Sequence, residues 1–371
     1  MSGAQVAAAE AIRIRVPFRR PVLTSLGIWS QRESWIVQLC DGAGAVGLGE
    51  AALDPGPGEQ TTELVRLIRE LVERVAGGEP LPDAAELEAA GVAGRALRCA
   101  LDSAALDLGR VWAKAAPGGP PRDIPVNAAI GVMEAGGTVA AAVAAVAAGF
   151  ATLKLKVGPE RDSAALVARV AAVRAAVGAE VRLRLDVNAA WDVATARERI
   201  AAVAPFGIEF VEQPVAVGDP SRLAAVRHGS PVPIAADEAV SSVAAARELL
   251  AARAADVLVV KPARVGGPLA AWEIAALAAA EGVPVVISTL FETGVGLAAA
   301  LATAACLPGG QSRRQLAHGL ATADLLESDL LVRGLPIVQG RMIVPREPGL
   351  GIALDGAALA RYTVEKIGTR P

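Results

Sequence analysis

Residues 181–237 contain three short apolar runs that each end in a carboxylate: Val181-Arg-Leu-Arg-Leu-Asp186, Ile208-Glu-Phe-Val-Glu212 and Ile234-Ala-Ala-Asp237. The carboxylates are 26 residues (212 minus 186) and 25 residues (237 minus 212) apart. An interval of this length accommodates one strand and one helix. Parallel strands that alternate with helices and end in polar residues are typical of a (β/α)8 barrel, whose active site lies at the C-terminal strand ends. The stretch therefore predicts an α/β fold of the (β/α)8-barrel type.

The same spacing continues outward to two lysines. Lys261 follows Asp237 by 24 residues (261 minus 237), and Lys156 precedes Asp186 by 30 (186 minus 156). We expect barrel strands at 126–130, 152–156, 181–186, 210–212, 234–237, 257–261, 285–288 and 315–320. The helices between them are expected at 139–148, 163–177, 193–203, 244–254 and 269–280.

The N-terminal part of the chain has a different pattern. Residues 11–16 alternate apolar and polar side chains, and residues 34–50 read as an antiparallel hairpin. Helical periodicity follows over residues 61–75 and 97–112. These elements predict a separate α+β capping domain.

A Pro- and Gly-rich stretch, Pro117-Gly-Gly-Pro-Pro121, is the best boundary in the chain. We therefore expect an α+β capping domain over residues 1–116 and a (β/α)-barrel catalytic domain over residues 122–320. The last residues no longer follow the barrel spacing, and extended segments within them predict that residues 325–371 return to the capping domain.

Composition restricts the partners. The net charge is −3 and no Lys/Arg run is present, so nucleic acid is an unlikely target and a small-molecule carboxylate is expected. Three cysteines without a Cys-x-x-Cys pair encode neither a disulfide framework nor a zinc site. No signal peptide is evident at the N-terminus, which predicts a cytoplasmic protein, and a homo-oligomer is compatible with the sequence.

Two charge-free segments, 135–153 and 293–312, approach the length of a membrane span. Both are rich in Ala and Gly and lie where barrel helices are expected. We interpret them as buried helices that pack on the sheet, and we expect no membrane association.

The chemistry follows from Asp186, Glu212 and Asp237 on neighbouring strands. Three carboxylates so close together require a cation, and ligation by oxygen alone suits Mg²⁺, or Mn²⁺, better than zinc. Barrel closure brings Lys156 and Lys261 toward this metal from opposite sides. An ammonium group beside a metal ion releases its proton more readily, so a lysine there can act as a base. Metal and lysine together can remove a proton next to a carboxylate while the metal stabilises the enolate.

A purely structural interpretation exists for each residue alone. A single acid at a strand end is usually a helix N-cap or a surface ion-pair partner, and Lys154-Leu-Lys156 alone could be the solvated side of a strand. Five such residues at barrel spacing favour a functional site.

The strings around these residues resemble the motifs of the enolase superfamily, muconate-lactonizing subgroup, over nearly the whole chain. The matching strings are Lys154-Leu-Lys156-Val-Gly, Leu185-Asp186-Val-Asn188-Ala-Ala-Trp191, Val211-Glu212-Gln213-Pro214, Ala236-Asp237-Glu238 and Val260-Lys261-Pro-Ala-Arg-Val-Gly-Gly267.

The resemblance implies a capping domain on a barrel and an enediolate stabilised by Mg²⁺. It implies that Asp186, Glu212 and Asp237 are the metal ligands and that Lys156 and Lys261 are the catalytic pair. It also implies that three further residues lie beside the metal ligands: Asn188, Glu238 and Lys154.

Within the subgroup, o-succinylbenzoate synthases, dipeptide epimerases, N-succinylamino acid racemases and muconate cycloisomerases share these motifs. Residues 288–296 and 318–329 resemble the synthases, and no Asp-x-Asp, typical of dipeptide epimerases, occurs between the seventh and eighth strands. The expected activity is therefore that of a lyase, the dehydration of 2-succinyl-6-hydroxy-2,4-cyclohexadiene-1-carboxylate in menaquinone biosynthesis. The string Lys261-Pro-Ala-Arg264 also resembles enzymes that combine this reaction with racemisation.

A barrel that binds a ligand without turnover is the non-enzymatic alternative, and the intact lysine pair argues against it. Substrate contacts are expected from the cap loops 23–27 and 51–57 and from the barrel. The individual candidates are Thr24, Ser25, Ser288 and Arg264.

Overall fold

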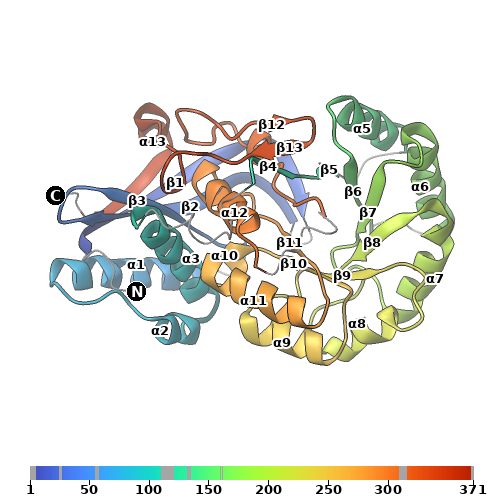
Figure 1. Cartoon of the computed structure of the whole chain (residues 1–371), viewed down its shortest axis with the longest axis horizontal. Coiled ribbons are helices and arrows are strands. Elements are labelled where there is room, and N and C mark those ends of the chain that lie inside the picture. The colour runs from blue at the N-terminus through green and yellow to red at the C-terminus, as the bar shows by residue number, and fades with distance from the viewer. Residues whose placement is uncertain are drawn as a thin grey trace.

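The computed structural model describes residues 6–24, 27–54, 58–109, 121–131, 135–158, 160, 162–308 and 316–368, without the side chains of residues 23 and 24. It contains a barrel ringed by helices and, beside it, a sheet with helices on one side (Figure 1). The C-terminal segment runs back to the start of the described chain, because residues 363–368 pair with residues 10–14.

Seven parallel strands form the barrel sheet in the order β11-β10-β9-β8-β7-β6-β5 within the described residues. Their side chains are mostly buried Val, Leu, Ile and Ala, as expected for strands covered on both faces. The bounds are β5 (Ala128–Ile130), β6 (Thr152–Lys156), β7 (Arg182–Asp186), β8 (Ile208–Glu212), β9 (Ile234–Ala236), β10 (Val257–Val260) and β11 (Val285–Ile287).

Helices alternate with these strands and cover the outside of the barrel (Figure 1). They are α5 (Ala135–Ala147), α6 (Ser163–Val177), α7 (Val193–Val203), η1 (Ala204–Phe206), α8 (Pro220–Arg227), α9 (Val243–Ala251), α10 (Pro262–Val265), α11 (Pro268–Ala280) and α12 (Gly294–Ala305).

Residues 316–320 close the barrel between β11 and β5. Gly319 bridges to Ser288 beyond β11, and His318 bridges to Val126 just before β5, both in parallel. The amide of Gly319 donates to the carbonyl of Ile287 at 2.8 Å. The described part of the expected eighth strand therefore completes the barrel, although it forms bridges and not a regular strand.

Arg184 supports this closure from inside the barrel. Its Nη1 donates to the carbonyl of Ala317 at 2.6 Å, and its Nε contacts Glu209 Oε2 at 2.6 Å. Burial, together with the Arg184 charge, lowers the pKa of His318 to about 3, so this histidine is a neutral structural residue. Its Nδ1 accepts a hydrogen bond from the amide of Ile287.

The capping sheet is antiparallel, in the order β14-β1-β2-β3. Trp35, Val37 and Leu39 point from one face of β2 into a core with the helices, while Ile36 on the other face joins the barrel core. The elements are β1 (Val6–Thr24), β2 (Gly27–Asp41), β3 (Val46–Ala52), β14 (Thr363–Gly368), α1 (Gly58–Ala76), α2 (Ala84–Ala89) and α3 (Gly91–Leu108).

The C-terminal segment contacts both bodies. Its strand β14 pairs with β1, whereas β13 (Arg341–Ile343) pairs with β12 (Ile337–Val338) and with β4 (Asp123–Pro125) at the start of the barrel. Two short helices, η3 (Ala323–Leu325) and α13 (Gly356–Tyr362), complete it. The division into residues 1–116, 122–320 and 325–371 stays a prediction, and residues 110–120, with most of the predicted boundary, lie outside the described residues.

Several element bounds differ from the sequence predictions. The helix expected over 97–112 begins at Gly91, and its described part ends at Leu108; Trp112 lies outside the described residues. The helix expected over 244–254 is α9, which ends at Ala251. Helices α2 and α8 were not predicted, although each begins after an aspartate N-cap, Asp83 and Asp219.

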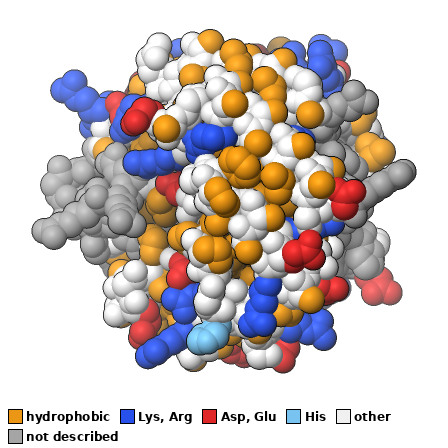
Figure 2. Space-filling view, turned by 90° about the vertical axis from the view of Figure 1, so that its right-hand side faces the viewer, with side chains coloured by type: hydrophobic (Ala, Val, Ile, Leu, Met, Phe, Trp, Pro, Cys, Tyr) orange, Lys and Arg blue, Asp and Glu red, His pale blue; other side chains and the backbone are white. Residues whose placement is uncertain are grey.

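The two charge-free segments differ in burial. Helix α12 is mostly buried, as predicted. The prediction for α5 was wrong in this respect, because Thr138 and Ala142 are its buried residues and Val143 is 45% exposed. A band of apolar side chains crosses the side of the molecule on which α5, α6 and α7 lie (Figure 1 and Figure 2). Among the described residues, no helix has the length and apolar character that crossing a membrane requires.

Candidate active site

Five charged residues meet at the C-terminal edge of the barrel sheet. Lys156, Asp186 and Glu212 are the last residues of β6, β7 and β8, and each is in register with the next. Asp237 follows β9, and Lys261 follows β10. The sequence predicted this arrangement from spacing alone, and the strand order places the lysines on either side of the carboxylates.

The three carboxylates are buried, with exposed fractions of 0% for Asp186 and 1% each for Glu212 and Asp237. Burial and the nearby charge of Asp186 raise the pKa of Glu212 to about 7. Burial also opposes ionisation of Asp186, but Lys154 and Lys156 hold the pKa of Asp186 below its usual range. Lysines therefore stabilise the negative charge of Asp186, whereas burial beside Asp186 disfavours that of Glu212.

Lys154 lies among these carboxylates. Its Nζ is 2.9 Å from both Asp186 Oδ2 and Glu212 Oε1. Although burial disfavours its charge, the carboxylates around it raise the pKa of Lys154 above its usual value. This lysine is held as a cation and is unsuited to act as a base.

Lys156 is oriented by residues of the barrel. Its Nζ donates to Asp186 Oδ2 at 2.7 Å and to Asn188 Oδ1 at 2.8 Å. Asn188 has a left-handed φ of 49°, a conformation that Asn tolerates better than most residues. Its Nδ2 donates to Glu238 Oε1 at 3.0 Å, so Asn188 links Lys156 to Glu238.

Lys261 is held in a different way. Its Nζ donates to Asp237 Oδ2 at 2.6 Å. The other oxygen of Asp237 accepts from Arg264 Nη1 at 2.9 Å, and Nη2 of Arg264 is 3.0 Å from Asp54 Oδ2 in the loop after β3. Burial disfavours ionisation of Asp237, but Lys261 and Arg264 lower the pKa of this carboxyl to about 2.

The donor set fits a hard divalent cation. Among the described residues, no group of three His, Cys, Asp or Glu side chains is arranged to hold a metal ion. The carboxylates contact lysines instead. Asp186 and Glu212 nevertheless face one ammonium nitrogen, so they can share a cation. Glu238 Oε2 is buried beside them without a hydrogen-bond partner in the described part of the chain. Buried carboxylate oxygens are the ligands that Mg²⁺ prefers.

The expected substrate contacts lie at the same edge where they can be located. Ser288 follows β11, and its Oγ donates to the carbonyl of Gly319 at 3.3 Å. Arg264 is engaged by Asp237 and Asp54, as described above. Ser25 and the side chain of Thr24 lie outside the described residues.

Two positioning residues were not predicted from the sequence. Gln213 Oε1 accepts from the amides of Asp237, at 3.1 Å, and of Ala239, at 3.2 Å, which fixes the turn that carries Asp237. Arg169 of α6 donates to the main-chain carbonyl of Lys156 at 3.0 Å. Gln213 directly follows Glu212, and a polar residue between Glu212 and Pro214 was the available signal.

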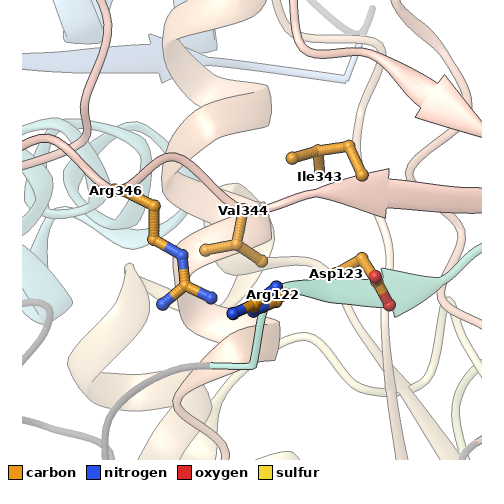
Figure 3. A pocket seen from close by; sticks show the side chains of 5 residues that line it. All are labelled: Arg122, Asp123, Ile343, Val344 and Arg346. Atoms are coloured by element: carbon orange, nitrogen blue, oxygen red, sulfur yellow. The ribbon is translucent and has the colours of Figure 1, made fainter.

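A separate surface pocket lies between β4 and β13, at the N-terminal end of the barrel strands (Figure 3). It is lined by Arg122, Asp123, Ile343, Val344 and Arg346. None of the five charged residues lines it, and the Asp123 carboxylate is paired with Arg341. The pocket is therefore distinct from the candidate active site.

Residues 137–358, more than half of the chain, match the family model described as Enolase C-terminal domain-like. The chain belongs to the enolase superfamily. Its known members include the o-succinylbenzoate synthase of Thermobifida fusca (strain YX), which is 44% identical over 61% of this chain and 68% of that protein. The L-Ala-D/L-Glu epimerase of Bacillus subtilis (strain 168) is 32% identical over 96% of this chain and 98% of that protein.

A solved structure gives the same fold. The dipeptide epimerase from Enterococcus faecalis V583, complexed with Mg and the dipeptide L-Leu-L-Tyr, superposes with a TM-score of 0.81. The two are 26% identical, over 94% of this chain and 99% of that one. The comparison confirms the predicted fold class, and enzymes of this superfamily use Mg in at least that structure.

Proposed function

We propose that the protein is an o-succinylbenzoate synthase, which dehydrates 2-succinyl-6-hydroxy-2,4-cyclohexadiene-1-carboxylate in menaquinone biosynthesis. The observation that carries the first step, removal of an α-proton, is the pair Lys156 and Lys261 on either side of buried carboxylates. The similarity to the T. fusca synthase supports this substrate over others of the superfamily. Residues 288–296 and 318–329, which resemble the corresponding segments of the synthases, add to this support.

Asp186, Glu212 and Asp237 would hold Mg²⁺, or Mn²⁺ in its place. When bound, the ion supplies positive charge that favours the enolate form of the substrate carboxylate. Lys154 contacts Asp186 and Glu212, and the amide of Asn188 donates to Asp186 Oδ1 at 3.2 Å. Glu238 is held by the side chain of Asn188.

Lys156 is the proposed base. It would break the C–H bond α to the ring carboxylate and take the proton on Nζ, which Asp186 and Asn188 orient. The same ammonium group would then give its proton to the hydroxyl that leaves from the same face of the ring. The C–O bond breaks, water departs, and the ring becomes aromatic. Lys261 would stay protonated across the ring and stabilise the negative charge.

Racemisation or epimerisation at an α-carbon is the second candidate, with an N-succinylamino acid or a dipeptide as substrate. The presence of a lysine on each side of the carboxylates favours it, because such a reaction needs an acid and a base on opposite faces. The similarity to the B. subtilis epimerase extends over nearly the whole chain. In this reaction Lys261 would serve as the second acid or base.

One assay separates the candidates. Wild-type protein is incubated with Mg²⁺ and the cyclohexadiene substrate, and o-succinylbenzoate formation is followed; a parallel sample in D₂O follows α-proton exchange of an N-succinylamino acid. We expect rapid dehydration that chelation by EDTA abolishes. Exchange without measurable dehydration would reject the synthase and favour the racemase. Dehydration at an unchanged rate without metal would reject the metal site.

A further inference from the structure

The loop between β11 and α12, residues 288–293, makes a dense set of contacts with the capping domain. The ring of Phe291 lies edge-on to Phe18 and Trp29, each at 5.9 Å between ring centroids. Its φ of 61° is left-handed, which is costly for an aromatic residue and requires support from its surroundings. Leu290 packs in a buried cluster with cap residues Ala52 and Cys99 and with Ala263.

The polar centre of this contact is Glu50, on β3 of the capping sheet, which is 1% exposed. Its Oε1 accepts from Ser34 Oγ at 2.7 Å, and its Oε2 accepts from Thr293 Oγ1 at 2.6 Å. The amide of Thr293 lies 3.1 Å from both carboxylate oxygens, and the amide of Gly296 donates to Oε2 at 3.0 Å. Most of these hydrogen bonds cross from the barrel to the cap.

The amides of Thr293 and Gly296 belong to the first turn of α12, where N–H groups have no acceptor within the helix. The N-cap residue Thr293 makes no side-chain capping bond of its own, and its hydroxyl donates to Glu50 instead. A carboxylate at this position also interacts favourably with the helix dipole. A residue 243 positions away in the chain therefore caps a barrel helix.

The surroundings leave little room for another arrangement. A Cβ on Gly296 would lie 2.5 Å from Glu292 Cβ and 3.1 Å from Glu50 Oε2. Glu292 is 3% exposed, and burial together with the Glu50 charge raises the pKa of Glu292 to about 7. Its Oε2 accepts from the amide of Leu290 within the same loop. Glu50 therefore accepts hydrogen bonds from α12, while Glu292 accepts one within the loop.

We propose that Glu50 is a positioning residue: its carboxylate fastens the capping domain to the loop at residues 288–293 and thereby sets the affinity of the site for substrate. The loop begins at the C-terminal end of β11, on the edge of the sheet that carries Lys156 and Lys261. Loss of these hydrogen bonds would displace the loop and the cap above the site, while Lys156, Asp186 and Glu212 keep their contacts within the barrel.

The test variant is Glu50→Gln in the full chain. Glutamine keeps the shape, but it replaces one of the two acceptor oxygens with an NH₂ group, so the N–H groups of α12 lose an acceptor and a favourable negative charge. Leaving such buried donors unpaired corresponds to roughly a 10-fold effect or more. We expect KM to rise about 10-fold with kcat within about threefold of wild type, and faster amide exchange at Thr293 and Gly296. Exchange is measured without substrate, so this outcome does not depend on which reaction the protein catalyses.

The matched control is Glu33→Gln, a carboxylate on the same sheet that pairs with Arg13 and Arg15 and is 29% exposed. It should leave KM and the exchange of α12 amides unchanged. A KM for Glu50→Gln within twofold of wild type, or a loss confined to kcat, would overturn the proposal.

A milder variant keeps the test available if Glu50→Gln does not fold. Thr293→Val removes the hydroxyl that donates to Glu50 Oε2 and keeps the side-chain size. It should raise KM about threefold, and the combination with Glu50→Gln should add little, because both changes break the same contact. An unchanged KM in Thr293→Val, or losses that multiply in the double variant, would contradict the proposal.

Discussion

Lys156 and Lys261 flank the same carboxylates, but different parts of the molecule hold them. Lys156 contacts Asp186 and Asn188, and its main-chain carbonyl accepts from Arg169, so its surroundings come from the barrel. Lys261 contacts Asp237, whose other oxygen binds Arg264, and Arg264 in turn pairs with Asp54 beside the capping sheet. The barrel alone orients one lysine, whereas the cap contributes to the surroundings of the other.

The different surroundings of the two lysines offer a way to separate the two proposed reactions. In the proposed dehydration, proton transfer takes place only at Lys156, on the barrel side of the site. A racemisation also needs proton transfer at Lys261. It therefore depends on the contacts that connect Asp237, the partner of Lys261, to Arg264 and Asp54. Changes on the two sides should separate the two activities.

The largest expected effect is that of Lys156→Ala. A positioned general base contributes about 10² to 10⁴ in rate, and Lys156 would act twice, so o-succinylbenzoate formation should fall by more than about 10³-fold. Steady-state rates at saturating Mg²⁺ provide the measurement, with Lys366→Ala, an exposed lysine on β14, as the control. A loss smaller than about 10-fold would remove Lys156 from its assigned role.

Lys261→Arg should have a smaller and selective effect. Arginine keeps a positive charge but does not release its proton at working pH. Dehydration should fall less than in Lys156→Ala, while α-proton exchange of an N-succinylamino acid that depends on Lys261 should be lost. Measuring both reactions on one preparation gives the ratio. Equal losses in the two reactions would show that Lys261 has the same role in dehydration and in exchange.

The supporting residues on each side should have modest effects that differ in selectivity. Asp54→Asn removes the charge that pairs with Arg264; because the Asp54 side chain is 31% exposed, the pair is worth little, and we expect at most about a fivefold loss, confined to exchange.

Arg169→Gln removes the donor to the Lys156 carbonyl and should slow dehydration and exchange alike, by roughly 10-fold. The kcat values of both variants in both reactions form the test. Identical patterns for Asp54→Asn and Arg169→Gln would contradict the separation of the two sides.

The smallest expected effect concerns the pH dependence of the free energy of unfolding, through Glu292 in the loop that contacts the capping domain. The pKa of Glu292 is raised from its usual 4.5 to about 7 in the folded protein, mainly by burial. The folded state then binds the proton more tightly than the unfolded state, so the free energy of unfolding should fall as pH rises from about 4.5 to about 7. Glu292→Gln should flatten this slope in urea titrations. Glu212 and Asp102, whose pKa values are raised to about 7 and about 6, contribute in the same direction and should leave a remainder.

The barrel and its charged edge could be predicted because their signal is local and repeated. Lys156, Asp186 and Glu212 each end a short apolar run, and parallel strands bring such ends together in any closed barrel. The superposition on a solved structure confirms the fold class that this pattern predicted. The short helix α2 could also have been found, since Asp83 and Glu86 form a capping box.

The links between cap and barrel could not be predicted. Arg264 and Asp54 are 210 positions apart, and Glu50 and Thr293 are 243 apart, so no periodic pattern relates them. From the local sequence alone, a carboxylate near the end of β3 is expected to be exposed to solvent. Only the packing of the sheet on the barrel buries Glu50 and turns it toward α12. The substrate contacts were uncertain for the same reason, because they depend on loops and not on strand spacing.

The most direct measurement is the crystal structure of the protein with Mg²⁺ and o-succinylbenzoate. We expect one ion bound by Asp186, Glu212 and Asp237, a ligand carboxylate on that ion, and the Nζ atoms of Lys156 and Lys261 on opposite faces of the ring. An ion held by other residues, or both lysines on the same face of the product, would contradict it.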